Sequence, residues 1–245
     1  MKTPQILQLG SLGLIVVGLL GAASLQAQST IATYDIGANT GGNDVTPTTA
    51  SGVTAATLTT TAAAGTGFAG TYAKTLWGAG TSLDPTKYIT WSVTPTAGNQ
   101  IDFAGANATF SLTYNGDSPG GPHGADTWAL HASTDNFATS DITLANNLSL
   151  GATFLAQIPE SVSLGAIAAQ TGTVTFRLYG YNDTKQVAGQ DSAGLANAGA
   201  PFTGTGGNLI INGTVSAVPE PSSYAAVFGA LAFGFVFLTR RLRKA

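Results

Sequence analysis

The sequence contains no cysteine among its 245 residues, and only 9% of its residues are charged. The absence of cysteine excludes a fold held together by disulfides, which is the usual solution for small secreted domains. It does not exclude a stable domain, because residues 28–217 (217 − 27 = 190 residues) are numerous enough to bury a core of their own.

Basic residues are scarce away from the two ends of the chain. Five of the nine lysines and arginines are Lys2 and the four cations within the last six residues. Residues 28–221 carry the other four and all twelve acidic residues, a formal charge of 4 − 12 = −8. Such an acidic region lacks the positive surface that neutralises phosphates, so we expect no nucleic-acid partner. The four basic residues are Lys74, Lys87, Arg177 and Lys185.

Groups for catalysis are also few. His123 and His131 are the two histidines, and no Gly-x-Ser-x-Gly motif accompanies them, so nothing marks a Ser-His-Asp hydrolase. His123, Asp126 and His131 do not match the spacing of a closed zinc site. Glu160 is the one glutamate before the tail, so a glycosidase would need two aspartates that meet in space, an alternative that the sequence leaves open. We therefore expect a protein that is not an enzyme and uses no cofactor.

Residues 1–27 have the three parts of a secretory signal peptide. Lys2 supplies the positive start, residues 12–20 form the apolar run, and small residues lead to a cleavage site after Ala27. A retained N-terminal anchor is the alternative, and the small residues behind the apolar run favour cleavage.

The last part of the chain, residues 218–245, also has three parts. A polar tetrapeptide precedes an uncharged segment over residues 222–239 (239 − 221 = 18 residues), and a basic end follows. Eighteen helical residues are just enough to cross a hydrocarbon core of about 30 Å, and a basic cluster behind them stays on the cytoplasmic side. We expect a transmembrane helix that acts as a membrane stop; a buried helix of a globular domain and a plain membrane anchor are the alternatives. The tetrapeptide is Val218, Pro219, Glu220 and Pro221, and the basic end contains Arg240, Arg241, Arg243 and Lys244.

This order of Pro219-Glu220-Pro221, short apolar helix and arginine-rich end resembles the PEP-CTERM sorting signal of exported bacterial proteins. The resemblance covers residues 218–245. It implies export through the secretion machinery, a transient membrane anchor, and removal of the tail by the membrane protease exosortase. The mature protein would then lie at the cell surface or outside the cell.

Between the two ends, residues 28–217 show the period-two alternation of β-strands. Alternating segments occur over residues 31–36, 87–95, 107–114, 126–133, 142–150, 152–158, 171–182 and 206–216, separated by Gly, Pro and Asn turns. No segment has a convincing helical period, so we expect one all-β domain, an antiparallel β-sandwich of jelly-roll type with two four-stranded sheets. An all-β solenoid is the alternative, although no repeat of fixed period is present.

Two segments, residues 130–137 and 175–182, resemble the β-sandwich ectodomains that are common among PEP-CTERM proteins. This resemblance implies a matrix, biofilm or cell-envelope protein, with no catalytic residues to transfer.

Carbohydrate binding without catalysis is the alternative function, because sugars stack on exposed aromatic rings. Trp77 lies beside glycines, which predicts a loop tip, and Tyr179 and Tyr181 share the outer face of their strand with Arg177. We therefore name Trp77, Tyr179 and Tyr181 as candidate contacts with an extracellular polysaccharide.

A calcium site is a further hypothesis. Oxygen ligands for Ca²⁺ could come from Asn39, Asn43 and Asp44, although their spacing is not that of an EF-hand and a simple turn explains them as well.

Overall fold

The fold is described by a computed structural model, which places residues 28–39, 44–64, 70–75, 77, 80–116, 124–150, 157–183, 191–197, 207–218, 228–229, 231–233 and 240. The signal peptide predicted over residues 1–27 lies outside these ranges.

Nine strands form the larger sheet. They are β1 (Ser29–Tyr34), β2 (Thr48–Thr49), β5 (Ala63–Ala64), β6 (Thr71–Thr75), β8 (Asn99–Asp102), β9 (Asn107–Gly116), β12 (Ile158–Ser163), β14 (Asp191–Ala196) and β15 (Leu209–Ala217). Their main path runs β2-β1-β15-β9-β14-β6-β5, while β12 pairs with β9 and β8 pairs with β15.

Six strands form the smaller sheet. They are β3 (Val53–Ala55), β4 (Thr59–Thr60), β7 (Tyr88–Pro95), β10 (Thr127–Ser133), β11 (Ile142–Ser149) and β13 (Val174–Tyr181). Their order is β11-β10-β13-β7-β3, with β4 also paired to β7.

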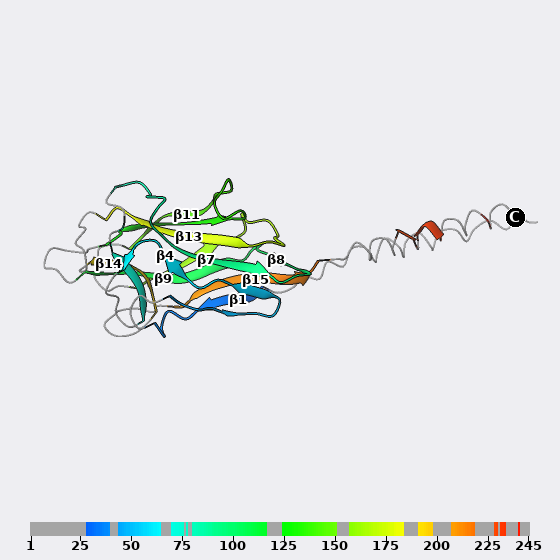
Figure 1. Ribbon diagram of the computed structural model, residues 1–245, viewed down its shortest axis with the longest axis horizontal. Coiled ribbons are helices and arrows are strands. Elements are labelled where there is room, and N and C mark those ends of the chain that lie inside the picture. Colours follow the sequence, from blue (N-terminus) through cyan, green and yellow to red (C-terminus); the bar gives the residue numbers. More distant parts are fainter. Residues whose placement is uncertain are drawn as a thin grey trace, which may run out of the picture.

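The two sheets form the two layers of an antiparallel β-sandwich, which confirms the predicted fold class. Figure 1 shows β11 and β13 in one layer and β1 and β15 in the other. β1 pairs with β15 from the far end of the domain, which is not the nearest-neighbour stacking of a solenoid. The sequence predicts two sheets of four strands each, whereas the larger sheet alone has nine strands among the residues that the structure describes.

The core lies between the sheets and follows the predicted alternation. In β7, Ile89, Trp91 and Val93 are at most 1% exposed, while the residues between them are half-buried. The Trp91 ring stacks on Phe176 of the neighbouring strand β13, with centroids 5.6 Å apart and planes 12° apart. Burial of one face in each strand therefore fixes the register of the smaller sheet.

Several strands depart from the sequence-based expectation. No strand is predicted for β6, β8 or β14, and the strand predicted over residues 152–158 falls largely on residues outside the described part of the chain. The structure instead has β12, which begins at Ile158 and carries Pro159 and Glu160. A proline and an inward-facing carboxylate interrupt the alternation on which the prediction depends.

Glu160 points towards the inner face of the sandwich at this outer strand. It lies opposite the buried Phe110 of β9, and facing residues of an antiparallel pair share a side of the sheet. Partial burial raises the pKa of the Glu160 carboxyl. An inward-pointing charge is one of the devices by which proteins prevent strands from adding to a sheet edge.

Glu160→Gln is therefore expected to stabilise the domain at neutral pH and to make no difference in acid. The folded-state pKa is raised, so the protonated carboxyl favours folding below the unfolded pKa of about 4.3, and this contribution is lost as pH rises through the folded pKa. Partial exposure limits the gain to less than about 1 kcal/mol. Urea denaturation of both proteins from pH 3 to pH 8 measures it; a difference that is constant with pH would contradict this assignment.

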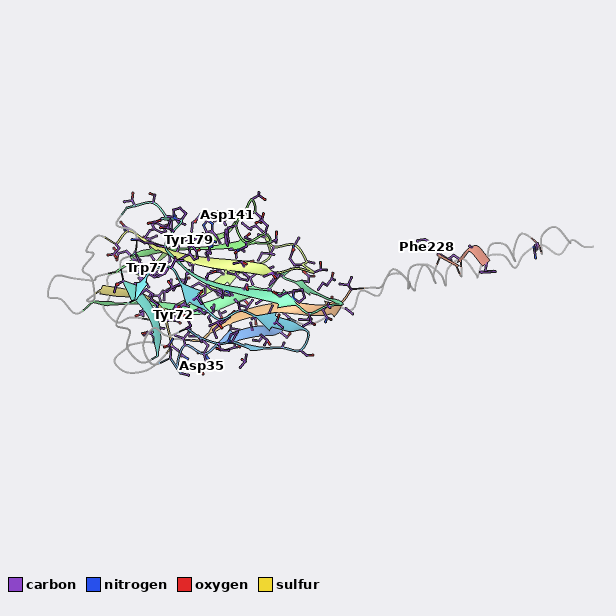
Figure 2. All side chains as sticks on the ribbon, viewed as in Figure 1. Asp35, Tyr72, Trp77, Asp141, Tyr179 and Phe228 are labelled. Carbon is purple, nitrogen blue, oxygen red and sulfur yellow. The ribbon has the colours of Figure 1, made fainter. Side chains whose placement is uncertain are left out.

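The sandwich ends where the tail begins. The last strand, β15, finishes at Ala217, and the Val218 amide donates to the carbonyl of Gly98 at 2.9 Å. Within the part of the chain that the structure describes, no helix is long and apolar enough to span a membrane. The predicted transmembrane helix over residues 222–239 falls mostly outside that part. Its described residues include Phe228, which is 68% exposed and lies away from the sandwich in Figure 2.

Candidate functional site

Trp77 is a core residue and not a loop-tip platform for sugars, so this expectation is wrong. Its side chain is 0% exposed, and its indole Nε1–H donates to the carbonyls of Lys74 (2.9 Å) and Ala193 (3.1 Å). The ring also packs edge-on against Trp128, with centroids 4.8 Å apart. No face of the ring is open to a ligand.

Tyr179 and Tyr181 are also buried, with 3% and 8% of their surface exposed. The Tyr181 hydroxyl donates to Asn147 Oδ1 at 3.1 Å, and the Tyr179 ring lies edge-on to Tyr88 at 5.6 Å. A stacking sugar needs an exposed ring face, so the prediction that these two tyrosines offer one is wrong.

Two of the three calcium candidates accept hydrogen bonds from the protein. The Asn39 carbonyl accepts from the amide of Gly70 at 2.7 Å, and Asp44 Oδ1 accepts from the Tyr72 hydroxyl at 3.2 Å. Asn43 lies outside the described residues. Across the described part of the chain, no three His, Cys, Asp or Glu residues gather into a possible metal site.

Few residues of the predicted sorting signal are described. Val218 follows the last strand, and Arg240 is exposed. The rest of the motif and of the basic end lie outside the described residues: Pro219, Glu220, Pro221, Arg241, Arg243 and Lys244.

The structure does bring one polar and aromatic cluster together, on the outer face of the smaller sheet. We call it the Arg177 cluster; Asp141 and Tyr179 mark its place in Figure 2. Its members come from β7, β10, β13 and the loop between β10 and β11. They are Tyr88, His131, Phe137, Asp141, Arg177 and Tyr179.

A histidine–aspartate pair forms one side of the cluster. His131 Nδ1 lies 2.7 Å from Asp141 Oδ1, and the His131 side chain is 12% exposed against 57% for Asp141. Because an ionised carboxylate only accepts, His131 Nδ1 carries the hydrogen and Nε2 is the free ring nitrogen. That Nε2 atom is buried and has no hydrogen-bond partner.

Arg177 lies at the centre. It faces His131 directly across the β10–β13 pair, and its guanidinium carbon lies 4.2 Å from the Tyr88 ring centroid and 4.1 Å from that of Phe137. Arg177 therefore makes cation–π contacts with both rings. Its Nε atom is buried and, like His131 Nε2, has no hydrogen-bond partner.

Asp135 holds the loop that carries Phe137. Its carboxylate accepts from the Ser133 and Thr139 hydroxyls at 2.8 and 2.6 Å and from the Ser140 amide at 3.0 Å. These hydrogen bonds lower the pKa of the Asp135 carboxyl, the Thr139 hydroxyl having the largest effect. The loop is thus fastened through its polar side chains.

Phe137 itself has a rare backbone conformation. Its φ is 62°, and φ of the preceding Asn136 is 58°; asparagine tolerates this region, but a bulky aromatic residue seldom adopts it. Such strain persists where the surrounding structure enforces it, and it concentrates at functional sites.

The electrostatics of the cluster favour a neutral Tyr179 beside a cation. Burial raises the pKa of the Tyr179 hydroxyl, and a hydrogen bond from the neighbouring Arg177 partly offsets this increase. The cluster thus combines one fixed cation, one oriented imidazole and neutral aromatic surfaces. It can bind an anionic or hydrogen-bonding group.

Sequence reasoning places part of this cluster and misses the rest. The period-two pattern predicts Arg177, Tyr179 and His131 on outer faces of their strands, and the structure brings them together. Phe137 and Asp141 are not predicted as site residues, since both lie around a loop whose conformation no strand pattern specifies. The run of Ser, Thr and Asp around Asp135 is the one signal of a fastened loop.

No family model, no curated protein and no solved structure matches this chain. The fold defines the class to which it belongs, an all-β protein with two antiparallel sheets.

Proposed function

We propose that this chain is an exported, non-catalytic protein of the cell surface or extracellular matrix, linked to biofilm or exopolysaccharide. Its tail over residues 218–245 is a PEP-CTERM signal that anchors it transiently in the membrane until exosortase removes it. The secretion machinery and exosortase are its processing partners. The folded part is a jelly-roll-like sandwich.

The position of the last strand carries this proposal. β15 ends at Ala217, and the amide of Val218, the first residue of the motif, donates a hydrogen bond to the carbonyl of Gly98. Cleavage beyond this point leaves every strand of the sandwich in place. A proline at position 219 suits this boundary, because it has no N–H to continue a strand ladder.

The start of the domain supports the same division of the chain. β1 begins at Ser29, two residues after the predicted cleavage site, and Ser29 pairs with Gly213 of β15. Both predicted processing points therefore lie at the same end of the sandwich. Removal of both segments would leave a complete domain over residues 28–218.

The intact mass of the protein from its native host, measured in each cell fraction, tests the proposal. We expect a mass that lacks residues 1–27 and the tail after about Pro221, in the surface or extracellular fraction. Additional mass would indicate an attached glycan or lipid. A full tail retained in the membrane fraction would show a plain anchor and contradict sorting.

Residues 28–218, produced alone, are expected to unfold in one cooperative transition with the same free energy as the longer chain, within about 0.5 kcal/mol. The matched control ends at Gly213 and so loses the part of β15 that pairs with β8, from Thr214↔Asp102 to Ala217↔Asn99. This shorter protein should have a clearly lower free energy of unfolding. Chemical denaturation followed by tryptophan fluorescence measures both; aggregation or lack of a transition in the 28–218 protein would contradict the proposed boundary.

A carbohydrate-binding module is the second candidate. The three aromatic residues first named for it are buried, so this function would depend on other side chains. The Arg177 cluster is the observation that favours it, because it presents a held cation beside aromatic rings on one face of the sandwich.

A further inference from the structure

Two buried nitrogen atoms in the Arg177 cluster have unmet hydrogen-bonding capacity. His131 Nε2 and Arg177 Nε lack partners, and the two residues lie directly opposite each other on neighbouring strands. Buried polar atoms are nearly always hydrogen-bonded, so two adjacent exceptions require an explanation. A ligand atom or a bridging water between them would satisfy both.

The hydrogen-bonding properties of Arg177 Nε and His131 Nε2 indicate which ligand groups they could bind. Arg177 Nε–H is a permanent donor. His131 Nε2 accepts when the ring is neutral and donates when the ring is protonated, since Asp141 holds the hydrogen on Nδ1. A sugar acid offers a group to each atom: its carboxylate accepts from Arg177 Nε–H, and a neighbouring hydroxyl donates to His131 Nε2, whose ring hydrogen is on Nδ1.

Phe137 lies against Arg177 and is the part of the cluster that could move. The Arg177 guanidinium carbon lies 4.1 Å from its ring centroid, and its backbone has the strained φ of 62°. A relaxed loop would withdraw the ring and uncover the guanidinium. The stored strain therefore lowers the free energy needed to open the site.

We propose that the Arg177 cluster binds a carboxylate of an acidic polysaccharide, with Arg177 as the donor, His131 as the acceptor for a sugar hydroxyl and Phe137 as a movable cover. This inference deepens the proposed link to extracellular polysaccharide by naming the sugar class and the residues.

The negative charge of residues 28–221 means that binding to an acidic polymer would depend on a particular site. Residues 28–221 carry a formal charge of −8, so the domain as a whole repels an acidic polymer. Binding to such a polymer must then come from a local site and cannot result from general attraction. Lys87 lies next to Tyr88 in the chain and offers a second nearby cation that is not part of the cluster, which makes it a natural control.

The experiment titrates the full chain with polygalacturonate, using affinity electrophoresis and calorimetry, with dextran as the neutral polymer. We expect binding to polygalacturonate and none to dextran. Arg177→Gln should lower the affinity about tenfold or more, and His131→Gln should lower it to a smaller extent. Phe137→Ala should raise the affinity, since the cover is gone, and Lys87→Gln should change it less than twofold.

Several outcomes would overturn the proposal. They are equal affinity for dextran, no binding to polygalacturonate, an Arg177→Gln protein that binds as well as the wild type, or equal losses for Arg177→Gln and Lys87→Gln. Unchanged thermal unfolding of each variant shows that the fold is intact; if Arg177→Gln unfolds, the affinity of Phe137→Ala decides, because a value at or below that of the wild type contradicts the role of Phe137 as a cover. Failure here leaves the mass measurement of the tail unaffected, so the two proposals fail separately.

Discussion

Gly194→Ala is expected to lower the free energy of unfolding by about 3 kcal/mol or more and to prevent folding of a marginally stable chain. Gly194 lies in β14, paired with Thr113 of β9 on one side and Ala73 of β6 on the other. A Cβ atom there would overlap the carbonyl oxygen of Tyr72 and lie 2.9 Å from the Cα of Ala73.

The size of this effect follows from what the new methyl group meets. Its nearest neighbours are backbone atoms of a paired strand, which cannot rotate away as a flexible side chain would. Relief requires β14 to separate from β6, at the cost of their hydrogen bonds and of the burial of Tyr72 and Leu195. Overpacking that moves a strand belongs to the severe end of its usual range.

Gly172→Ala is the matched control. No heavy atom lies within 4 Å of a Cβ built at Gly172, so this substitution should change the free energy of unfolding by less than about 0.5 kcal/mol. Guanidinium denaturation of residues 28–218 compares the three proteins. Similar stability of Gly194→Ala and Gly172→Ala would show that β14 and β6 are not packed as closely as the structure has them.

The close approach at Gly194 also explains why β14 escapes prediction from sequence. Its central residues are small, Ala193, Gly194 and Ala196 around a single leucine. Periodicity detects large apolar side chains, and this strand is buried because its backbone is close to its neighbours. By contrast, β7 and the first half of β13 bury every second side chain, and the sequence predicts both strands within a few residues.

The residues of the Arg177 cluster likewise fall into those that strand periodicity predicts and those that it does not. Residues on regular strands, such as Arg177 and Tyr179, have faces that the period of two predicts. Phe137 reaches Arg177 only through a loop with two consecutive positive φ angles, and no alternation encodes this. Exposure is the quantity that the pattern predicts least well, because Tyr179 is on the outer face and is still covered by its neighbours.

Trp77 shows how local composition can mislead. The glycines that follow it suggest an exposed turn, yet the ring turns back into the core beside Gly180. A Cβ on Gly180 would lie 3.0 Å from the Trp77 ring and 2.8 Å from Ala125, so the space for the indole exists because residue 180 has no side chain. Trp128 lies opposite Gly180 on β10 and fills the rest of the pocket.

Trp77→Ala should therefore lower the free energy of unfolding by about 3–5 kcal/mol. The substitution removes a fully buried ring and the edge-on contact with Trp128, and it leaves the carbonyls of Lys74 and Ala193 without the indole donor. Trp77→Phe keeps part of the packing and should lose less. Chemical denaturation of residues 28–218 measures both changes.

A comparison of stability with binding distinguishes this structural role from the sugar-stacking role that the sequence suggests. Trp77→Phe, assayed well below its melting temperature, should bind polygalacturonate as the wild type does, because Trp77 is not part of the Arg177 cluster. A sugar platform would give the reverse pattern, with weakened binding and little change in stability. Complete burial of the ring, two hydrogen bonds from its nitrogen and a glycine that makes room for it all point to stability as the property that Trp77 controls.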